Sequence, residues 1–246
     1  MTEFCGASRN AYKVIGPVIG SSGKARGCCG MKLMMLFAGA YVAGSVNFPI
    51  LLFNLLKKED PRSGFSKNPG MFNVYRQHGL FWAMVILILD VGRSLGVGFI
   101  SAIFLQITLI PWVGLGLILG NRLPCFHQFR GGKGVANYLG FSAFIAPLWA
   151  LAAILAWLII YSFFRIACIG SLTMVLILAT GTLLACQFDP IAASGILCTV
   201  AVIFYSHKSN FTEFFQRQTS LSRKNMAPAL RRKHWFCVIF THRLDT

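Results

Sequence analysis

The sequence predicts an all-α integral membrane protein with about seven transmembrane helices, some of them short, an outside N-terminus and a cytoplasmic C-terminus. Of the 246 residues, 56% are hydrophobic and 12% are charged, whereas a soluble domain is about 25% charged. Apolar runs long enough to cross a bilayer recur from residue 31 almost to residue 206. The 23 Lys and Arg residues, against 7 Asp and Glu, gather mainly between these runs and in the tail.

This charge distribution indicates a membrane surface, and not nucleic acid, as the partner. In a soluble protein a net charge of +16 would suggest DNA or RNA binding. Here the basic residues flank apolar runs, so attraction to membrane lipids of the inner leaflet accounts for them. The eight cysteines show no ligand spacing, and we therefore expect no metal site.

We expect three regions along the chain. Residues 1–30 are rich in glycine, serine and other small residues and lack a spanning apolar run, which indicates a disordered leader or a true start at Met31. Residues 31–211 form the polytopic membrane domain. Residues 212–246 form a basic cytoplasmic tail.

Seven apolar segments are expected to span the membrane. The first lies within 31–56. The run 79–120 is too long for one span and holds a proline, so we divide it into two helices with a turn near 106–111. The stretch 135–164 forms either one long tilted helix or two short ones divided at Pro147. The last two spans are expected at 167–186 and 190–205.

The positive-inside rule decides between these alternatives. The polar segments 57–78 and 121–133 and the tail are all basic, so all three are expected in the cytoplasm. Because an even number of spans must then separate them, the middle stretch divides at Pro147, and Arg165 returns to the cytoplasmic side. The polar segments can therefore meet at one face of the membrane.

The most informative motif is the glycine–lysine loop, Arg130-Gly131-Gly132-Lys133-Gly134. Glycines let a backbone turn tightly and present N–H groups to an anion, and the two cations add charge beside them. The spacing is not that of a nucleotide-binding P-loop. The loop is therefore either a plain turn or a phosphate site.

Three other groups of polar residues are candidates. The segment 66–76 is either a turn-rich amphipathic loop or a phosphate or glycerol site. At the end of the last span, a histidine and an asparagine three residues apart share one face if helical. Within the second span an acid and a base, about 16 Å from its cytoplasmic start, form an ion pair that locks helices or takes part in catalysis. These residues are Ser66, Asn68, Asn73 and Arg76; His207 and Asn210; and Asp90 and Arg93.

Together these segments resemble the acyl-phosphate:glycerol-3-phosphate acyltransferase family (PlsY-type), a bacterial integral-membrane family with three cytoplasmic motifs. The resemblance covers roughly residues 36–211, and the motifs follow the order of the family. The matching residues are Gly44, Ser45, Phe48, Asp60, Arg62, Ser66, Asn68, Gly70, Asn73, Val74 and Arg76 in the first motif; Leu89, Asp90 and Arg93 downstream; Gly120, Pro124, Phe126, Phe129 and 131–136 in the second; and His207 and Asn210 in the third.

The resemblance implies transfer of a fatty acyl group from acyl-phosphate to the 1-hydroxyl of glycerol 3-phosphate, which yields lysophosphatidic acid for phospholipid synthesis. Acyl-phosphate is already activated, so the protein has mainly to align two anions and stabilise the developing oxyanion, and no cofactor is expected. A multi-pass protein of the bacterial inner membrane is implied, with 31–211 as its acyltransferase-like domain. The implied catalytic residues are Ser66, Arg76, Lys133, His207 and Asn210; the substrate-binding residues are Asn68, Asn73, Arg130, Gly131, Gly132 and Gly134; and the site-supporting residues are Asp90 and Arg93.

The chain also departs from the family pattern. Phe65 and Lys67 stand where the first motif has glycines, Phe72 stands in place of a threonine, and Asn121 in place of a histidine. These changes leave the anion-binding charges intact. The alternatives are therefore an acyltransferase with a changed donor or acceptor, or a non-catalytic anion-binding or transport protein on the same scaffold.

Overall fold

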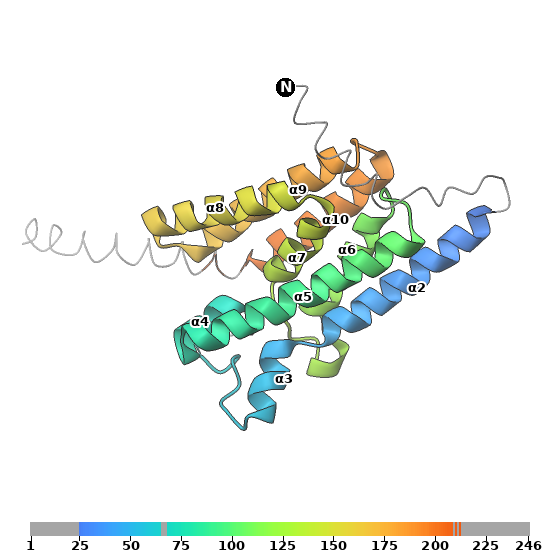
Figure 1. Ribbon diagram of the computed structural model, residues 1–246. Helices are drawn as coiled ribbons and strands as arrows, with labels where there is room; N and C mark the ends of the chain where they lie inside the picture. The colour runs from blue at the N-terminus through green and yellow to red at the C-terminus, as the bar shows by residue number, and fades with distance from the viewer. Residues whose placement is uncertain (1–24, 65–67, 209, 211, 213–246) are drawn as a thin grey trace, which may run out of the picture. The chain divides into compact units, whose positions relative to one another are not determined.

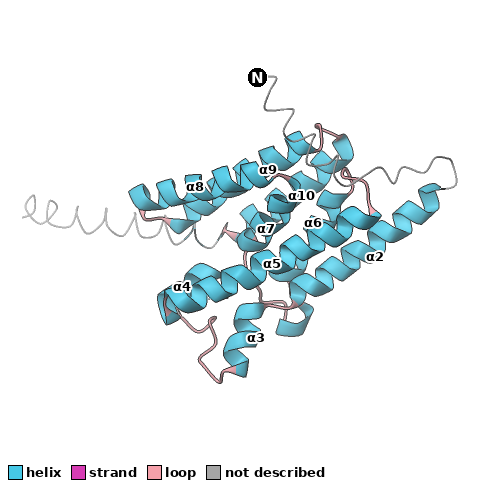
Figure 2. Cartoon of the chain, viewed as in Figure 1, coloured by secondary structure: helices cyan, strands magenta, loops and turns pink. Residues whose placement is uncertain are grey.

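The computed structural model describes residues 25–64, 68–208, 210 and 212, and it divides the chain into two units, 1–206 and 207–246. All regular secondary structure in the described part is helical, as Figure 2 shows, which confirms the all-α prediction. The elements of the first unit (Figure 1) are α2 (Ala25–Ser45), α3 (Phe48–Leu55), α4 (Met71–His78), α5 (Leu80–Phe104), α6 (Ile110–Arg122), η1 (Cys125–His127), α7 (Val135–Ile145), α8 (Pro147–Phe164), α9 (Ala167–Ala185) and α10 (Pro190–Ser206).

Prolines mark where several helices begin. Pro49, Pro111 and Pro147 each occupy one of the first two positions of α3, α6 and α8. Proline suits this position because its fixed φ is helical and its missing N–H would have no partner there. The predicted turn between α5 and α6 and the predicted division at Pro147 are therefore both present.

Two local features differ from the expectation. The first apolar run is not one straight helix, because α2 and α3 are bent by 41° at a short break. In addition, the end of the first polar segment, where a loop was one expectation, forms helix α4. Its amphipathic sequence buries Val74 completely, and Gly79 ends it with a φ of +85°, which glycine adopts at little cost.

Among the described residues, three helices are long and apolar enough to cross a membrane: α5 with 25 residues, α8 with 18 and α9 with 19. The bent pair α2–α3 adds a fourth if it counts as one span. All seven predicted segments are helical, but α6, α7 and α10 have 13, 11 and 17 residues, fewer than the ~20 that a full crossing needs. The count of about seven spans and their orientation stay predictions.

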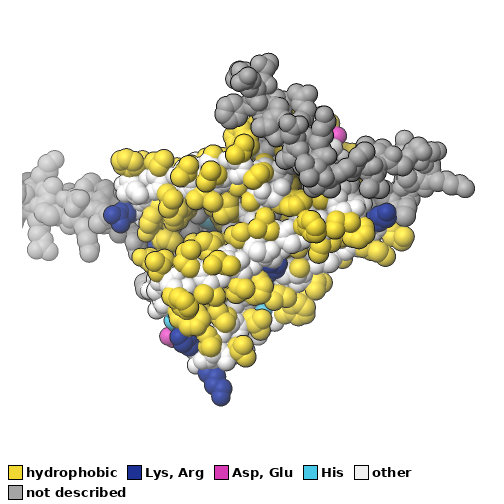
Figure 3. Space-filling model, in the orientation of Figure 1, with side chains coloured by type: hydrophobic (Ala, Val, Ile, Leu, Met, Phe, Trp, Pro, Cys, Tyr) yellow, Lys and Arg dark blue, Asp and Glu magenta, His cyan; other side chains and the backbone are white. Residues whose placement is uncertain are grey.

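The surface of these helices is suited to lipid. Figure 3 shows hydrophobic side chains spread across the visible face, with most Lys and Arg side chains at its margins. Large apolar residues such as Phe99 on α5 and Phe163 on α8 are 56% and 80% exposed. Continuous apolar exposure of this kind is rare in soluble monomers.

Close packing of α2 against α6 places the loop that follows α6. A Cβ on Gly44 would overlap the carbonyl oxygen of Leu117, and a Cβ on Gly120 would overlap that of Tyr41. The two backbones are therefore in direct contact, as small residues allow between membrane helices. The ends of both helices consequently lie beside the glycine–lysine loop.

Candidate active site

The end of α2 holds the segment that leads into the glycine–lysine loop. The Tyr41 hydroxyl donates a hydrogen bond of 2.8 Å to the Leu123 carbonyl. The Cys125 N–H donates to the Ser45 hydroxyl at 3.4 Å. Side chains about 80 positions earlier in the chain therefore fix the start of this loop.

A tight turn precedes the glycines. The N–H groups of His127 and Phe129 both donate to the Pro124 carbonyl, each at 3.1 Å. Gln128 and Phe129 have φ values of 55° and 56°, a left-handed conformation that non-glycine residues adopt only at a cost of about 1–2 kcal/mol each. Strain of this kind is concentrated at functional sites.

The two adjacent glycines pack against the end of α6. The Gly132 N–H donates a hydrogen bond of 2.9 Å to the Asn121 carbonyl. A Cβ on Gly131 would overlap that same oxygen and contact Pro124. Glycine is required here for close approach of the loop to α6, and not for the expected display of N–H groups, because the Gly132 N–H is used inside the protein and is not presented to a ligand.

Lys133 lies immediately before the N-terminus of α7. Its side chain is half-buried, and Gly134, with a φ of 82°, is the N-cap of the helix. No side chain caps α7, so the first N–H groups of this 11-residue helix lack the usual side-chain acceptor. A lysine beside such a helix end is a favourable place for a phosphate group.

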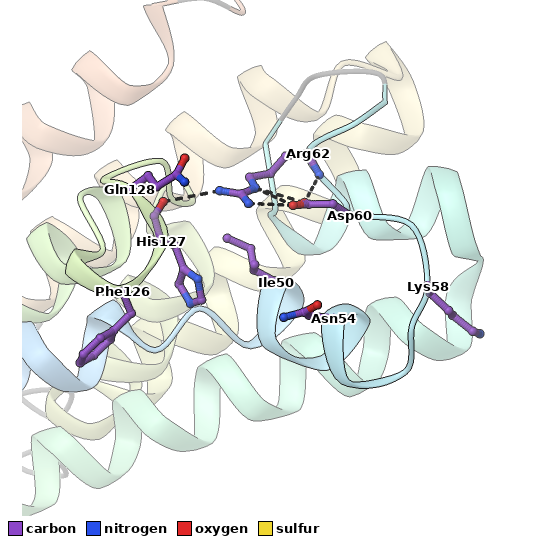
Figure 4. A pocket seen from close by; sticks show the side chains of 8 residues that line it. All are labelled: Ile50, Asn54, Lys58, Asp60, Arg62, Phe126, His127 and Gln128. Atoms are coloured by element: carbon purple, nitrogen blue, oxygen red, sulfur yellow. Dashed lines mark hydrogen bonds and ion pairs between the residues drawn. The ribbon is translucent and has the colours of Figure 1, made fainter.

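The first polar segment reaches this loop through Arg62. Its guanidinium forms an ion pair of 2.7 Å with Asp60 and contacts the His127 carbonyl at 3.5 Å. These residues line a polar pocket of about 280 Å³ (Figure 4), in which the Lys58 side chain points away from the ion pair. The complete lining is Ile50, Asn54, Lys58, Asp60, Arg62, Phe126, His127 and Gln128.

Charges in this pocket shift the pKa values of two groups. Burial alone would raise the pKa of Asp60, but its hydrogen bonds and charge attraction to Arg62 hold that pKa below its ordinary value. Burial and the Arg62 cation lower the pKa of His127, although the Asp60 carboxylate opposes them. His127 is therefore biased towards its neutral form.

The other predicted residues of the first segment lie on or near α4. The Asn73 amide donates to the carbonyls of Pro61 at 2.7 Å and Gly64 at 3.3 Å, so it holds the turn in which Arg62 lies. Asn68 is half-buried and Arg76 is exposed. Ser66 lies outside the described residues.

Asp90 and Arg93 form an ion pair of 2.8 Å within α5. The Arg93 guanidinium also donates to the Asn137 side chain on α7 at 2.6 Å, and to the carbonyls of Ala43 and Val46 where α2 ends. The pair therefore joins α5 to α7, whose N-terminus follows Lys133, and to the break after α2.

His207 and Asn210 belong to the second unit, which is described at only a few positions. There the Asn210 N–H donates to the His207 carbonyl at 3.0 Å, a short helical turn consistent with the predicted shared face. In the described part of the chain, no group of three or more His, Cys, Asp or Glu side chains could hold a metal ion.

Sequence reasoning did not single out several residues that the structure brings to the site. His127 and Gln128 line the pocket, Asn137 binds Arg93, and Phe72 lies over the Arg76 guanidinium. Phe72 and Arg76 are four residues apart, a spacing that predicts contact between their side chains once α4 is known to be helical. The other contacts join distant segments and leave no local pattern.

Comparisons with known proteins agree with the motifs. A family model described as glycerol-3-phosphate acyltransferase matches residues 34–217. A glycerol-3-phosphate acyltransferase of Pseudomonas paraeruginosa is 34% identical over 178 residues, covering 72% of this chain and 92% of that protein. One of Burkholderia ambifaria is 31% identical over 193 residues, covering 77% and 91%.

A solved structure shares the fold. The crystal structure of PlsY, an integral membrane glycerol 3-phosphate acyltransferase, in its glycerol 3-phosphate form has a TM-score of 0.69 and 28% identity, covering 75% of this chain and 92% of that one. Its lysophosphatidic acid form has a TM-score of 0.67. The predicted integral membrane fold is thereby confirmed.

Proposed function

The chain belongs to the glycerol-3-phosphate acyltransferase family, and from this premise we propose that it transfers a fatty acyl group to glycerol 3-phosphate with acyl-phosphate as the donor. The product is lysophosphatidic acid. Family membership and the forms in which PlsY was crystallised support the acceptor and product. The donor is proposed from the sequence resemblance and from the chemistry of the loop.

The observation that carries this proposal is the position of Lys133 at the uncapped N-terminus of α7. The cation and the positive end of the helix together favour a phosphate dianion. The same positive charges stabilise the negative charge that develops on the acyl oxygen as the acceptor hydroxyl attacks the acyl carbon. The bond between the acyl carbon and the donor phosphate then breaks, and the departing phosphate takes up the hydroxyl proton, so no covalent enzyme intermediate forms.

We assign the remaining roles from the motifs. Arg76 offers a planar cationic fork to a substrate phosphate, and Ser66, His207 and Asn210 complete the catalytic set. Asn68, Asn73, Arg130 and Gly134 bind substrate. Gly131 and Gly132 shape the loop, because both pack against the Asn121 carbonyl, and Asp90 and Arg93 support the loop from within the membrane. We place the protein in the bacterial inner membrane, since the relatives compared are bacterial and the spans are apolar on their surface.

The test is a phosphate-release assay on purified protein in lipid nanodiscs. Wild type should release phosphate from acyl-phosphate only when glycerol 3-phosphate is present, and acyl-coenzyme A should not replace the donor. Lys133→Ala should lower the rate about 10²- to 10³-fold, the usual effect of removing a group that stabilises an oxyanion. The exposed Lys32 on α2 provides the control, because Lys32→Ala should keep the wild-type rate.

Three outcomes would contradict the proposal. Equal rates for wild type and Lys133→Ala would remove the catalytic role of the loop. Anion binding by wild type without lysophosphatidic acid formation would favour the non-catalytic alternative, and activity with acyl-coenzyme A alone would indicate a changed donor.

A further inference from the structure

Helix α4 carries an aromatic contact that the catalytic motifs do not explain. The Phe72 ring lies edge-on to two rings of α8, with centroid distances of 6.3 Å to Trp157 and 5.3 Å to Tyr161. Those two rings are stacked on each other at 5.0 Å. We call Phe72, Trp157 and Tyr161 the α4–α8 aromatic cluster. Contacts of this geometry restrict a ring beyond simple burial.

The fixed ring of Phe72 in turn holds the side chain of Arg76. The guanidinium carbon of Arg76 lies 4.8 Å from the centre of the Phe72 ring, one helical turn along α4. This is within the range of a cation–π interaction. Arg76 itself is exposed, so without the ring its long side chain would sample many rotamers.

The contact with Phe72 leaves Arg76 able to bind an anion. The ring lies on one side of the guanidinium, and the Arg76 side chain is otherwise exposed. Because a guanidinium carries five N–H donors in a planar fork, a phosphate can accept hydrogen bonds from the exposed side while Phe72 stays in place. An arginine ordered in advance loses less freedom when it binds, which improves affinity for the anion.

We propose that Phe72 is a positioning residue for the reaction: it holds the Arg76 guanidinium ready for the phosphate of a substrate. This inference rests on the proposed function, because it assigns to Arg76 the binding of a substrate phosphate. The chain has phenylalanine at this position where the family pattern has threonine, a side chain without an aromatic face.

The test compares four variants of Phe72 and Arg76, two single changes of Phe72, Arg76→Gln and one double variant, in the phosphate-release assay. Phe72→Leu keeps an apolar side chain but removes the aromatic face, and it should raise the KM for one phosphate substrate about two- to fivefold, the range of an exposed cation–π contact. Phe72→Tyr keeps the face and should stay within about twofold of wild type. In an Arg76→Gln background, Phe72→Leu should have no further effect on kcat/KM, since the group that it positions is gone.

A control variant separates positioning from packing. Phe99 on α5 makes a comparable edge-on contact of 6.4 Å with Phe144, and Phe99→Leu should leave the KM values unchanged. All variants should elute as wild type does on gel filtration. If Phe72→Leu lowers kcat/KM by the same factor with Arg76 and with Gln at position 76, its effect is structural and the inference is wrong.

The outcomes for the two proposals differ. An active wild type with an unchanged Phe72→Leu variant would overturn the positioning role and leave the acyltransferase function intact. A wild type that forms no lysophosphatidic acid would overturn both.

Discussion

Removing the guanidinium of Arg93 is expected to destabilise the protein strongly. The side chains of Arg93 and Asp90 are only 8% and 9% exposed, and the pair lies in the middle of the longest span. Arg93→Gln would leave the Asp90 carboxylate without its cation. It would also remove donors from the carbonyls of Ala43 and Val46.

The magnitude follows from these contacts. Breaking a buried ion pair by removal of one partner costs about 3–5 kcal/mol, and an aspartate at the centre of a span costs about 2.5–3.5 kcal/mol. We therefore expect Arg93→Gln to lower the free energy of unfolding by about 3 kcal/mol. Arg93→Lys keeps the charge but not the planar fork, so its effect should be smaller, about 1–2 kcal/mol.

The measurement is an unfolding titration with sodium dodecyl sulfate in mixed micelles, followed by circular dichroism. The double variant Asp90→Asn/Arg93→Gln should be more stable than Arg93→Gln alone, since it leaves no unpaired carboxylate. Arg165→Gln, at an exposed arginine after α8, should change stability by less than about 0.5 kcal/mol. If Arg93→Gln unfolds at the same detergent fraction as Arg165→Gln, the ion pair does not stabilise the helix packing.

Two further predictions concern the loop and its pocket. Gly131→Ala should reduce lysophosphatidic acid formation at least tenfold, because its Cβ would displace the loop from the Asn121 carbonyl. The control Gly39→Ala should be neutral, since a Cβ there meets nothing within 4 Å. Equal activities of the two variants would refute the role of Gly131 in placing the loop. Stability should fall as the pH drops below about 6.5, since His127 with its lowered pKa binds a proton less readily when folded than when unfolded. The melting temperature of His127→Gln should fall less than that of wild type between about pH 7.5 and 5; parallel curves would contradict the assigned pKa shift.

Element positions were largely predictable because their signals are local. Apolar runs and the prolines at 111 and 147 specify where helices lie and where α6 and α8 begin, and the structure agrees with them. The bend before Pro49 was not predicted, because the apolar run 31–56 continues through it. Helix α4 was harder to predict, since Asn68, Pro69 and Gly70 are turn residues. Burial of Val74 favours the helix, and burial depends on packing that a short segment does not reveal.

The sequence by itself determined the membrane class, the approximate positions of the helices and the family, because composition, apolar runs and motif order are properties of the chain alone. Only the tertiary structure decided which polar groups meet. Arg62 contacts the His127 carbonyl 65 positions away, and the Gly132 N–H is used by Asn121 and so is withheld from a ligand. Such contacts depend on how α2, α5, α6 and α7 pack, and packing is set by side-chain shape between distant segments.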